Sequence, residues 1–388
     1  MTSHGIVQAN NETLRMNPPL SATVSKAASG LTRETRVSSW TQPSRWIWAI
    51  AAVAFLCYLP VVLTDRAVFG FRLSNMQLLN LGLSQVNLML IAMLGALSLN
   101  FLTGSAGLIS IGHAAFYAVG AMTAAITGSQ WGWPFPLVLV AAGIAGALAG
   151  VLAGLPSLRV RGLYFVLSTF AVHYIVVFAF MEYQFKFFDV VGVPYKPASL
   201  GPIDLNTPMR WYFFLLPVVA LVYWLLSNSL RTREGRAMMA MRDHELATTS
   251  AGVDVRYLRL KAFGLSSAIA AMAGALYAYF LTNVTSEFFG IQFAIQFIAM
   301  IIIGGMGSLS GSLVGAAVWL LLPSIITGLA SQAGDSTGLT RLLLVDHKAQ
   351  LVQLVFGTLV ILLLIFAPGG LAGIGRQIRS RLASRRNG

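Results

Sequence analysis

The stretch MQLLNLGLSQVNLMLIAMLGALSLN, residues 76–100, decides the fold class because it holds 25 successive residues without a charged side chain. About 20 apolar residues are enough for a helix to cross the hydrocarbon core of a bilayer. Similar runs lie before and after it along the chain. We predict ten membrane spans, at 46–64, 76–100, 107–128, 134–155, 163–182, 211–229, 261–282, 290–306, 311–329 and 350–367.

The composition of the 388 residues agrees with a membrane protein. Hydrophobic residues make up 56% and charged residues 10%, whereas soluble domains carry about 25% charged residues. A mean hydropathy of +0.74 also excludes a disordered chain, which would be polar and highly charged. We therefore expect an all-α polytopic membrane protein with about 8–10 transmembrane helices. The third, eighth and ninth spans are rich in glycine and could be broken or re-entrant.

The charges predict the topology, because Lys and Arg concentrate in cytosolic loops. With the N-terminus inside, the cytosolic segments carry 19 basic and 6 acidic residues, and the outer loops carry 7 of each. The net charge of +13 thus falls on one face and requires no nucleic-acid partner. We predict a disordered cytosolic N-terminal tail at 1–45, a transmembrane domain at 46–375 and a basic cytosolic C-terminal tail at 376–388, so that both termini are cytosolic.

Polar and small residues interrupt the segment LTGSAGLISIGHAAFYAVGAMTAA, residues 102–125. Glycine allows two helices to approach closely, and it also allows a backbone break that lines a polar pathway. Either helix packing or a substrate pathway would account for the pattern. The candidate pathway residues are Gly107, Ser110, Gly112 and His113.

Catalytic signatures are missing from the sequence. The glycine run at 304–311 lacks the Gly-Lys pair that a phosphate-binding loop needs, and neither HExxH nor GxSxG occurs. No acidic residue lies near the centre of a predicted span, which disfavours a proton-driven carrier. We expect a transport protein that is not an enzyme, has no metal site and binds no cofactor itself.

Four ordered motifs resemble those of the permease subunits of branched-chain amino-acid ABC importers. Residues 102–125 are similar to that family's LTGYAGQISLGHAAF, with Ser105 and Leu108 in place of its tyrosine and glutamine. GGMGSLSGSLVGA, residues 304–316, is similar to GGxGSxxGPxxGA, with Ser312 in place of its proline. The other two are LRVRGLYFVLSTFA, residues 158–171, and FAPGGLAG, residues 366–373.

The largest predicted cytosolic loop, residues 230–261, has seven basic and four acidic residues. Its apolar residues recur at helical spacing, which predicts an amphipathic helix from Arg236 to Ser250, with Gly252 as a left-handed cap. Such a helix could lie on anionic lipid headgroups. The sequence GRAMMAMRDHELATTSAG also resembles the family's coupling helix, GRALRAIRDNEIAAEALG, which docks into an ATPase groove.

The resemblance implies a set of coupling residues on this helix. Met238, Met241 and Leu246 would be apolar anchors, because flexible apolar side chains fill irregular pockets. The remaining positions that match the family, or that would form the polar rim, are Arg236, Arg242, Asp243, Glu245 and Gly252.

The same resemblance implies the activity and the partners. The chain would be the permease subunit of an ATP-driven importer in the bacterial inner membrane, carrying branched-chain or related amino acids, or similar small polar solutes, into the cytoplasm. It would pair with a second permease as a heterodimer, two ATPase subunits that bind ATP and Mg²⁺, and a periplasmic substrate-binding protein. The alternatives are a stand-alone secondary carrier or channel, or an ABC permease for urea, amides, aromatic acids or sugars.

Overall fold

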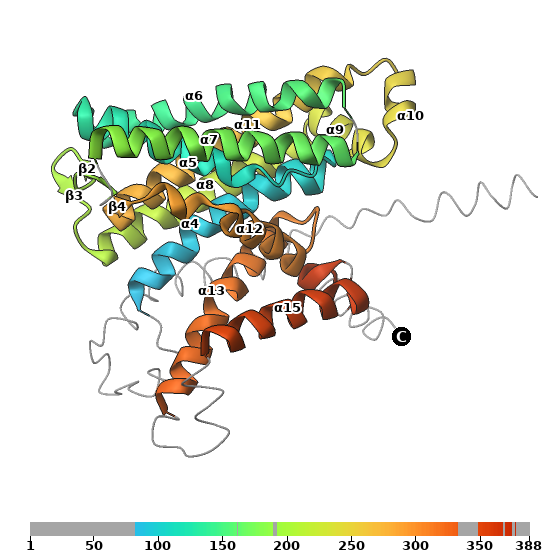
Figure 1. Cartoon of the computed structure of the whole chain (residues 1–388). Coiled ribbons are helices and arrows are strands. Elements are labelled where there is room, and N and C mark those ends of the chain that lie inside the picture. Colours follow the sequence, from blue (N-terminus) through green and yellow to red (C-terminus); the bar gives the residue numbers. More distant parts are fainter. Residues whose placement is uncertain are drawn as a thin grey trace, which may run out of the picture. The chain divides into compact units, whose positions relative to one another are not determined.

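The computed structural model describes residues 82–160, 162–188, 192–332, 348–367, 369–374 and 377. The predicted tail 1–45, the span at 46–64 and all of the tail 376–388 except residue 377 lie outside these residues. Within the described part, nearly all regular structure is helical (Figure 1). This confirms the predicted all-α class.

Six of the described helices are long and apolar enough to cross a membrane. They correspond to predicted spans, and two of them continue into a short segment of different helical pitch. The six are α4 (Leu83–Asn100) with the π-helix η2 (Phe101–Ser105), α6 (Phe135–Gly154) with the 3₁₀ turn η4 (Leu155–Leu158), α7 (Leu163–Phe188), α8 (Pro208–Arg231), α11 (Val255–Leu281) and α13 (Leu309–Gln332).

Three further helices complete the correspondence with the predicted spans. They are α5 (His113–Ala124), which continues into the π-helix η3 (Ala125–Gln130), α12 (Ile291–Gly304) and α15 (Lys348–Phe366). The glycine-rich spans behave differently from one another. The helix of the third span begins only at His113, after a turn over residues 107–112, whereas α12 and α13 are continuous.

Small residues hold the central helices together. Helix α11 packs most extensively against α6 and α5. A Cβ atom added to Gly120 of α5 would lie 1.8 Å from the carbonyl oxygen of Ala271, and one added to Gly146 of α6 would lie 2.3 Å from the Cβ of Ala271. Such contacts exclude larger side chains, so these glycines allow the backbones to approach closely, as small residues do in membrane bundles.

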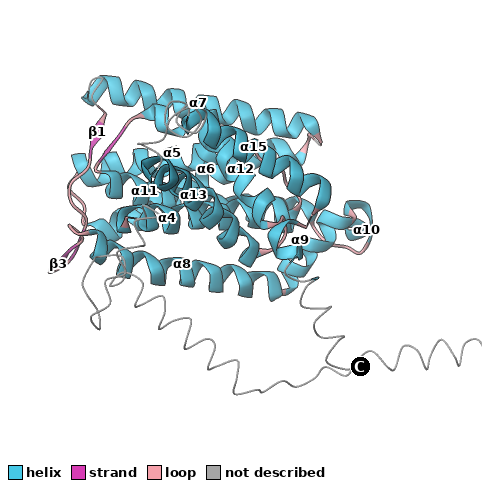
Figure 2. Ribbon diagram, turned by 90° about the horizontal axis from the view of Figure 1, so that it is seen from below, coloured by secondary structure: helices cyan, strands magenta, loops and turns pink. Residues whose placement is uncertain are grey.

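Short strands lie at one end of the bundle, which we call the strand end (Figure 2). There β1 (Val193–Pro194) pairs antiparallel with β4 (Asn283–Val284), and β2 (Ser199–Leu200) pairs antiparallel with β3 (Ile203–Asp204). The Tyr195 hydroxyl donates to the carbonyl of Ala121 at 3.0 Å. Burial raises the pKa of the Tyr195 phenol, so the group stays a neutral donor.

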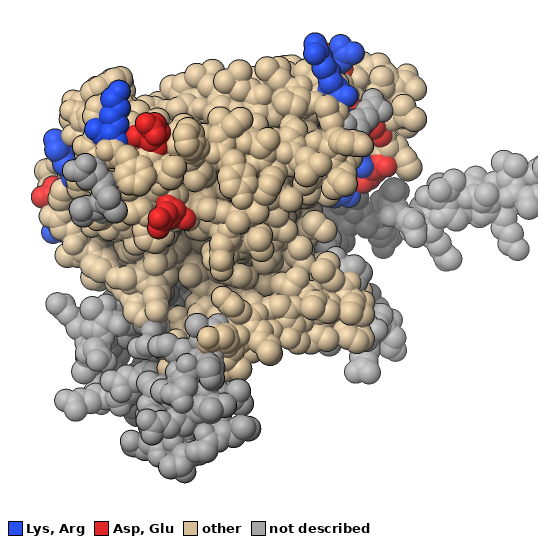
Figure 3. Space-filling model, in the orientation of Figure 1, with Lys and Arg blue, Asp and Glu red and all other residues tan. Residues whose placement is uncertain are grey.

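Charged side chains gather at the two ends of the described bundle, and the visible face between them shows no Lys, Arg, Asp or Glu among the described residues (Figure 3). One charged end carries the strands, and the other carries the short helices α9 (Arg233–Asp243) and α10 (Glu245–Ser250) (Figure 1). A charge-free band between two charged ends is the pattern expected of a protein that spans a bilayer.

Candidate coupling and transport site

Four segments far apart in the sequence meet at the end of the bundle opposite the strands, which we call the motif end. These segments overlap or adjoin the four motifs that resemble those of the permease family. A Cβ atom on Gly305, at φ 112°, would lie 2.4 Å from the carbonyl oxygen of Gly369, so only glycine fits there. The segments are the end of η2 with the turn that follows it (104–112, called the turn after α4), the described residues between α6 and α7 with the start of α7 (155–160 and 162–163, called the α6–α7 turn), the α12–α13 turn (305–308) and residues 369–374.

Asn100, the last residue of α4, ties this helix to the α12–α13 turn. Its side-chain Nδ2 donates to the carbonyl of Ser308 at 2.8 Å and to Oγ of Ser312 at 2.6 Å, and its Oδ1 accepts from the backbone N–H of Gly307 at 2.8 Å. Asn100 is fully buried. Ser312 stands where the family's pattern has proline, and its own N–H donates to Ser308 O at 3.1 Å, a bond that proline cannot make.

The coupling segment, which we define as α9 and α10 together, is two helices and not the single predicted helix from Arg236 to Ser250. The chain is extended at His244 (φ −149°, ψ 93°), which separates them. Gly252, at φ 80°, follows the end of α10, and the N–H groups of Gly252 and Val253 bond to Thr249 O and Thr248 O. The predicted left-handed cap at Gly252 is therefore confirmed as a Schellman motif.

The predicted apolar anchors do not share one exposed face. Met238 and Met241 are 2% and 5% exposed and belong to the core of this chain, whereas Leu246 is 76% exposed. In this structure the two methionines are covered by helices of the same chain, so their role as docking anchors stays a prediction. The apolar face of α9 packs against α8, α11 and η2 of the same chain.

The polar residues of the coupling segment divide between inward and outward contacts. Arg242 Nη1 donates to the carbonyl of Gly104 at 2.6 Å, and its guanidinium also pairs with Asp243 at 3.0 Å. Glu245 pairs with Arg259 of α11 at 2.6 Å. Arg236 is exposed and donates to Arg231 O at 2.6 Å. Two of the predicted rim residues, Arg242 and Glu245, thus also connect the coupling segment to the transmembrane helices.

The candidate pathway residues lie close to the motif end, in and after the turn that precedes α5. Ser110 and His113 are each 1% exposed, and His113 Nε2 lies 2.8 Å from Oγ of Ser98. Oγ of Ser110 and Nδ1 of His113 have no hydrogen-bond partner among the described residues. A Cβ atom on Gly112 would lie 2.1 Å from Thr169 O, so Gly112 has a packing role in this structure.

Position 107 also requires glycine for structural reasons. Its φ is +74°, and a Cβ atom there would lie 2.6 Å from Cγ of Arg242. The turn after α4 therefore needs glycine at this position both for its backbone conformation and for the passage of the arginine. The pathway function of the four residues stays a prediction. Ser110, Gly112 and His113 are buried against protein here, whereas Gly107 is exposed.

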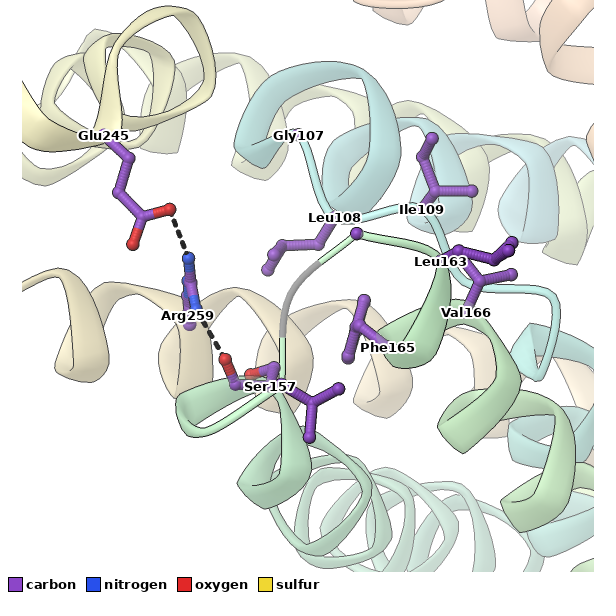
Figure 4. A pocket seen from close by; sticks show the side chains of 11 residues that line it. Gly107, Leu108, Ile109, Ser157, Leu163, Phe165, Val166, Glu245 and Arg259 are labelled. Carbon is purple, nitrogen blue, oxygen red and sulfur yellow. Dashed lines mark hydrogen bonds and ion pairs between the residues drawn. The ribbon is translucent and has the colours of Figure 1, made fainter.

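A cavity of about 430 Å³ opens beside the coupling segment. It lies between the turn after α4 and the α6–α7 turn, with Glu245 and Arg259 on its polar side (Figure 4). Its apolar wall includes Leu108, Phe165 and Val166. Leu108 stands where the family's signature has glutamine, so the apolar wall is partly a property of this sequence.

A second cavity, of about 130 Å³, lies among α4, α5, α11, α12 and α13. Aromatic side chains, including Tyr117, Tyr277 and Phe293, line it together with Gln296. Neither Ser110 nor His113 is among the residues that line the two cavities.

Sequence reasoning missed Asn100 and Arg259. Each has a sequence signal: Asn100 is a polar residue at the end of a long apolar run, and Arg259 lies just inside the apolar helix α11. However, Ser308, which Asn100 contacts, is 208 residues away in the sequence, and Ser157, which Arg259 contacts, is 102 residues away. No local pattern identifies these two contacts.

The long apolar helices and the charge-free band define a multi-pass membrane protein. The sequence model of the family described as "Branched-chain amino acid transport system / permease component" matches residues 82–364. The chain belongs to this family. It is therefore a permease component of an ABC importer and not a catalytic subunit, and this membership implies ATPase and binding-protein partners in general.

Within the aligned regions, curated relatives are between a quarter and a third identical to the chain. It is 29% identical to the high-affinity branched-chain amino acid transport system permease protein LivM of Escherichia coli K12, over 72% of this chain and 67% of the relative. It is 27% identical to the autoinducer 2 import system permease protein LsrC of E. coli K12 / DH10B (72% and 78% covered). It is 29% identical to the galactofuranose transporter permease protein YtfT of E. coli K12 (83% and 86% covered). No solved structure matches the chain.

Proposed function

We propose that this chain carries branched-chain or related amino acids, or similar small polar solutes, into the cytoplasm across a bacterial inner membrane. It works with a second permease in a heterodimer, two ATPase subunits that bind ATP and Mg²⁺, and a periplasmic substrate-binding protein. The family match over residues 82–364 carries this proposal. The motif end supports it, because Arg242 of the coupling segment contacts there the turn after α4, which bears one of the family's motifs. Glu245 of the coupling segment also pairs with Arg259, which in turn contacts the α6–α7 turn.

The proposed substrate class has weaker support than the assignment to an importer. The names of the relatives mention three different substrates: branched-chain amino acids, autoinducer 2 and galactofuranose. Ser105 and Leu108 also replace the tyrosine and glutamine of the branched-chain signature. We favour amino acids because the matched family is described by that transport system. Urea, amides, aromatic acids and sugars are the alternatives.

A ligand screen tests the substrate class directly. The periplasmic binding protein that functions with this permease would be titrated with leucine, isoleucine, valine, aromatic amino acids, urea, short amides and sugars. We expect saturable binding of an amino acid. Tight binding of a sugar alone, with no binding of amino acids, would overturn the amino-acid assignment and leave the importer assignment intact.

The coupling segment is proposed to dock into an ATPase subunit through its outer surface. Leu246 is the exposed apolar anchor, Arg236 and Asp243 provide polar contacts at the rim, and the exposed cap at Gly252 ends the surface. Met238 and Met241 pack into the core of this chain and fix α9 to the transmembrane helices. A large exposed apolar side chain on a polar helix at the cytosolic end is typical of an interface, since buried apolar anchors supply most of the binding free energy there.

Replacement of Leu246 by Ser tests this docking. Loss of an interface anchor costs about 2 kcal/mol, which weakens ATPase binding about 30-fold. We expect the Leu246→Ser permease to lose ATPase co-purification or substrate-stimulated ATP hydrolysis in vesicles. The matched control is Ala247→Ser, an exposed neighbour on another face of α10. A stand-alone carrier or channel predicts transport that needs no ATPase, and a helix lying on lipid predicts wild-type stimulation in the Leu246→Ser protein.

Ser110, His113, Gly107 and Gly112 are proposed to lie on or beside the substrate route. The unpaired buried hydroxyl of Ser110 supports this, because buried polar groups normally have a partner. Replacement of Ser110 by Leu should lower transport without loss of the ATPases. Unchanged transport would leave only the packing explanation.

A further inference from the structure

Two ion pairs connect the coupling segment to α11, and they differ in burial. Glu234 of α9 pairs with Lys261, and the two side chains are 44% and 41% exposed. Glu245 of α10 pairs with Arg259 at 2.6 Å, and these side chains are 28% and 10% exposed. Exposed ion pairs contribute little, whereas removal of one partner of a buried pair is costly because it leaves the other charge unpaired. The pair of Glu245 and Arg259 is therefore the stronger connection.

Arg259 contacts a third segment as well. Its Nη1 donates to the carbonyl oxygen of Ser157 in η4, which begins the α6–α7 turn (Figure 4). One guanidinium thus joins the carboxylate of α10, the first turns of α11 and the end of α6. A planar guanidinium suits this position because its N–H groups point at several partners in fixed directions. Lysine carries the same charge but cannot reproduce that geometry.

The surroundings of Arg259 leave room for a change of arrangement. The cavity of about 430 Å³ lies between the α6–α7 turn and the turn after α4, so these two turns can move relative to each other without compressing a packed core. Nε of Arg259 is buried and has no partner among the described residues. An unpaired buried donor raises the free energy of this arrangement relative to one in which the donor is paired.

We propose that Arg259 is a positioning residue that transmits a displacement of α10 to the α6–α7 turn. This inference rests on the proposed function, in which closure of the ATPase subunits displaces the coupling segment. Glu245 moves with α10, and the guanidinium of Arg259 moves with the carboxylate of Glu245 because the two are paired. The carbonyl of Ser157 moves in turn because it accepts a hydrogen bond from that guanidinium. The end of α6 and the start of α7 then shift at the motif end. Two discrete packings of this junction would correspond to two states of access in the transporter.

The test uses the complete importer in lipid vesicles, with substrate transport and ATP hydrolysis measured together. We expect Arg259→Met to lower the amount of substrate carried per ATP hydrolysed at least tenfold while the ATPase subunits still co-purify. Arg259→Lys should give an intermediate ratio, because it keeps the charge for Glu245 but loses the fixed geometry toward Ser157. The matched controls, Glu234→Gln and Lys261→Met, should stay within twofold of the wild type.

A double variant separates transmission from simple stability. Glu245→Gln with Arg259→Met removes both charges, so no unpaired buried charge remains. Transmission predicts that the ratio of transport to hydrolysis stays low in the double variant. Recovery of this ratio in the double variant would overturn the inference and leave a purely structural ion pair, as would a wild-type ratio in Arg259→Met. In both of these cases the wild-type importer still couples ATP hydrolysis to transport, whereas failure of the wild-type permease to bind ATPases would overturn the proposed function as well.

Discussion

The two helices of the coupling segment are neighbours in the sequence but differ in their capping and in the burial of their apolar side chains. Helix α9 has eleven residues, a side-chain N-cap from Thr232 and two buried methionines. Helix α10 has six residues, no side-chain N-cap at His244 and a leucine that is 76% exposed. The difference indicates that α9 is fixed by the core of the permease, whereas α10 presents an exposed apolar side chain at the surface. Each substitution below therefore has a different expected cost in the two helices.

The largest expected effect is the loss of a buried methionine from α9. Met238→Ser removes a side chain that is 2% exposed, and truncation of core methionine costs about 2–5 kcal/mol. The melting temperature of the purified permease in detergent should fall clearly. Leu246→Ser in α10 should change the free energy of unfolding by less than about 0.5 kcal/mol. Equal shifts for the two variants would remove the distinction between the helices.

The next effect concerns the end of α10. Gly252 has φ 80°, and nothing lies within 4 Å of a Cβ atom added there, so only backbone strain opposes a side chain. Gly252→Ala should cost about 1–2 kcal/mol, measured by thermal unfolding. Gly252→Asn should cost less, because asparagine tolerates the left-handed region better than alanine does. A larger cost for asparagine would show that the position is limited by space instead.

A smaller effect is expected at the start of α9. The hydroxyl oxygen of Thr232 accepts from the N–H of Gly235 at 3.1 Å, and loss of such a cap costs about 1 kcal/mol. Thr232→Ala should therefore lower the melting temperature, and Thr232→Ser should preserve it. The corresponding change in α10, His244→Ala, should leave stability nearly unchanged. A cost at His244 as large as at Thr232 would mean that α10 is also fixed by its cap.

The smallest expected effect is a gain in the stability of α10. His244→Asn places a capping side chain at the start of α10, where the backbone is already extended. Hydrogen exchange of the amides in 246–250 should slow about twofold, which corresponds to about 0.5 kcal/mol. The amides of α9 should exchange as before. Unchanged exchange in α10 would show that its tertiary contacts, and not its cap, limit its stability.

The comparison also shows what the sequence could predict. The span predictions from residue 76 onward agree with described helices because hydropathy alone requires about 20 apolar residues per crossing. The break at His244 could not be predicted, since neither proline nor glycine marks it. The spacing of Met238 and Met241 predicted an apolar face correctly, but a periodic pattern does not tell whether that face contacts the same chain or a partner. Asn100 and Arg259 were missed because their roles depend on distant segments.

The pairing of Asn100 with Ser312 has a consequence for how this sequence can diverge. Ser312 accepts a hydrogen bond from Asn100, and its N–H bonds to Ser308. Proline at 312 would retain neither bond, and a buried amide would be left with a donor to satisfy elsewhere. The two positions, 212 residues apart, are therefore expected to change together. A suppressor of Ser312→Pro should arise at Asn100, as a smaller residue without a side-chain donor that needs a hydrogen-bond acceptor at position 312.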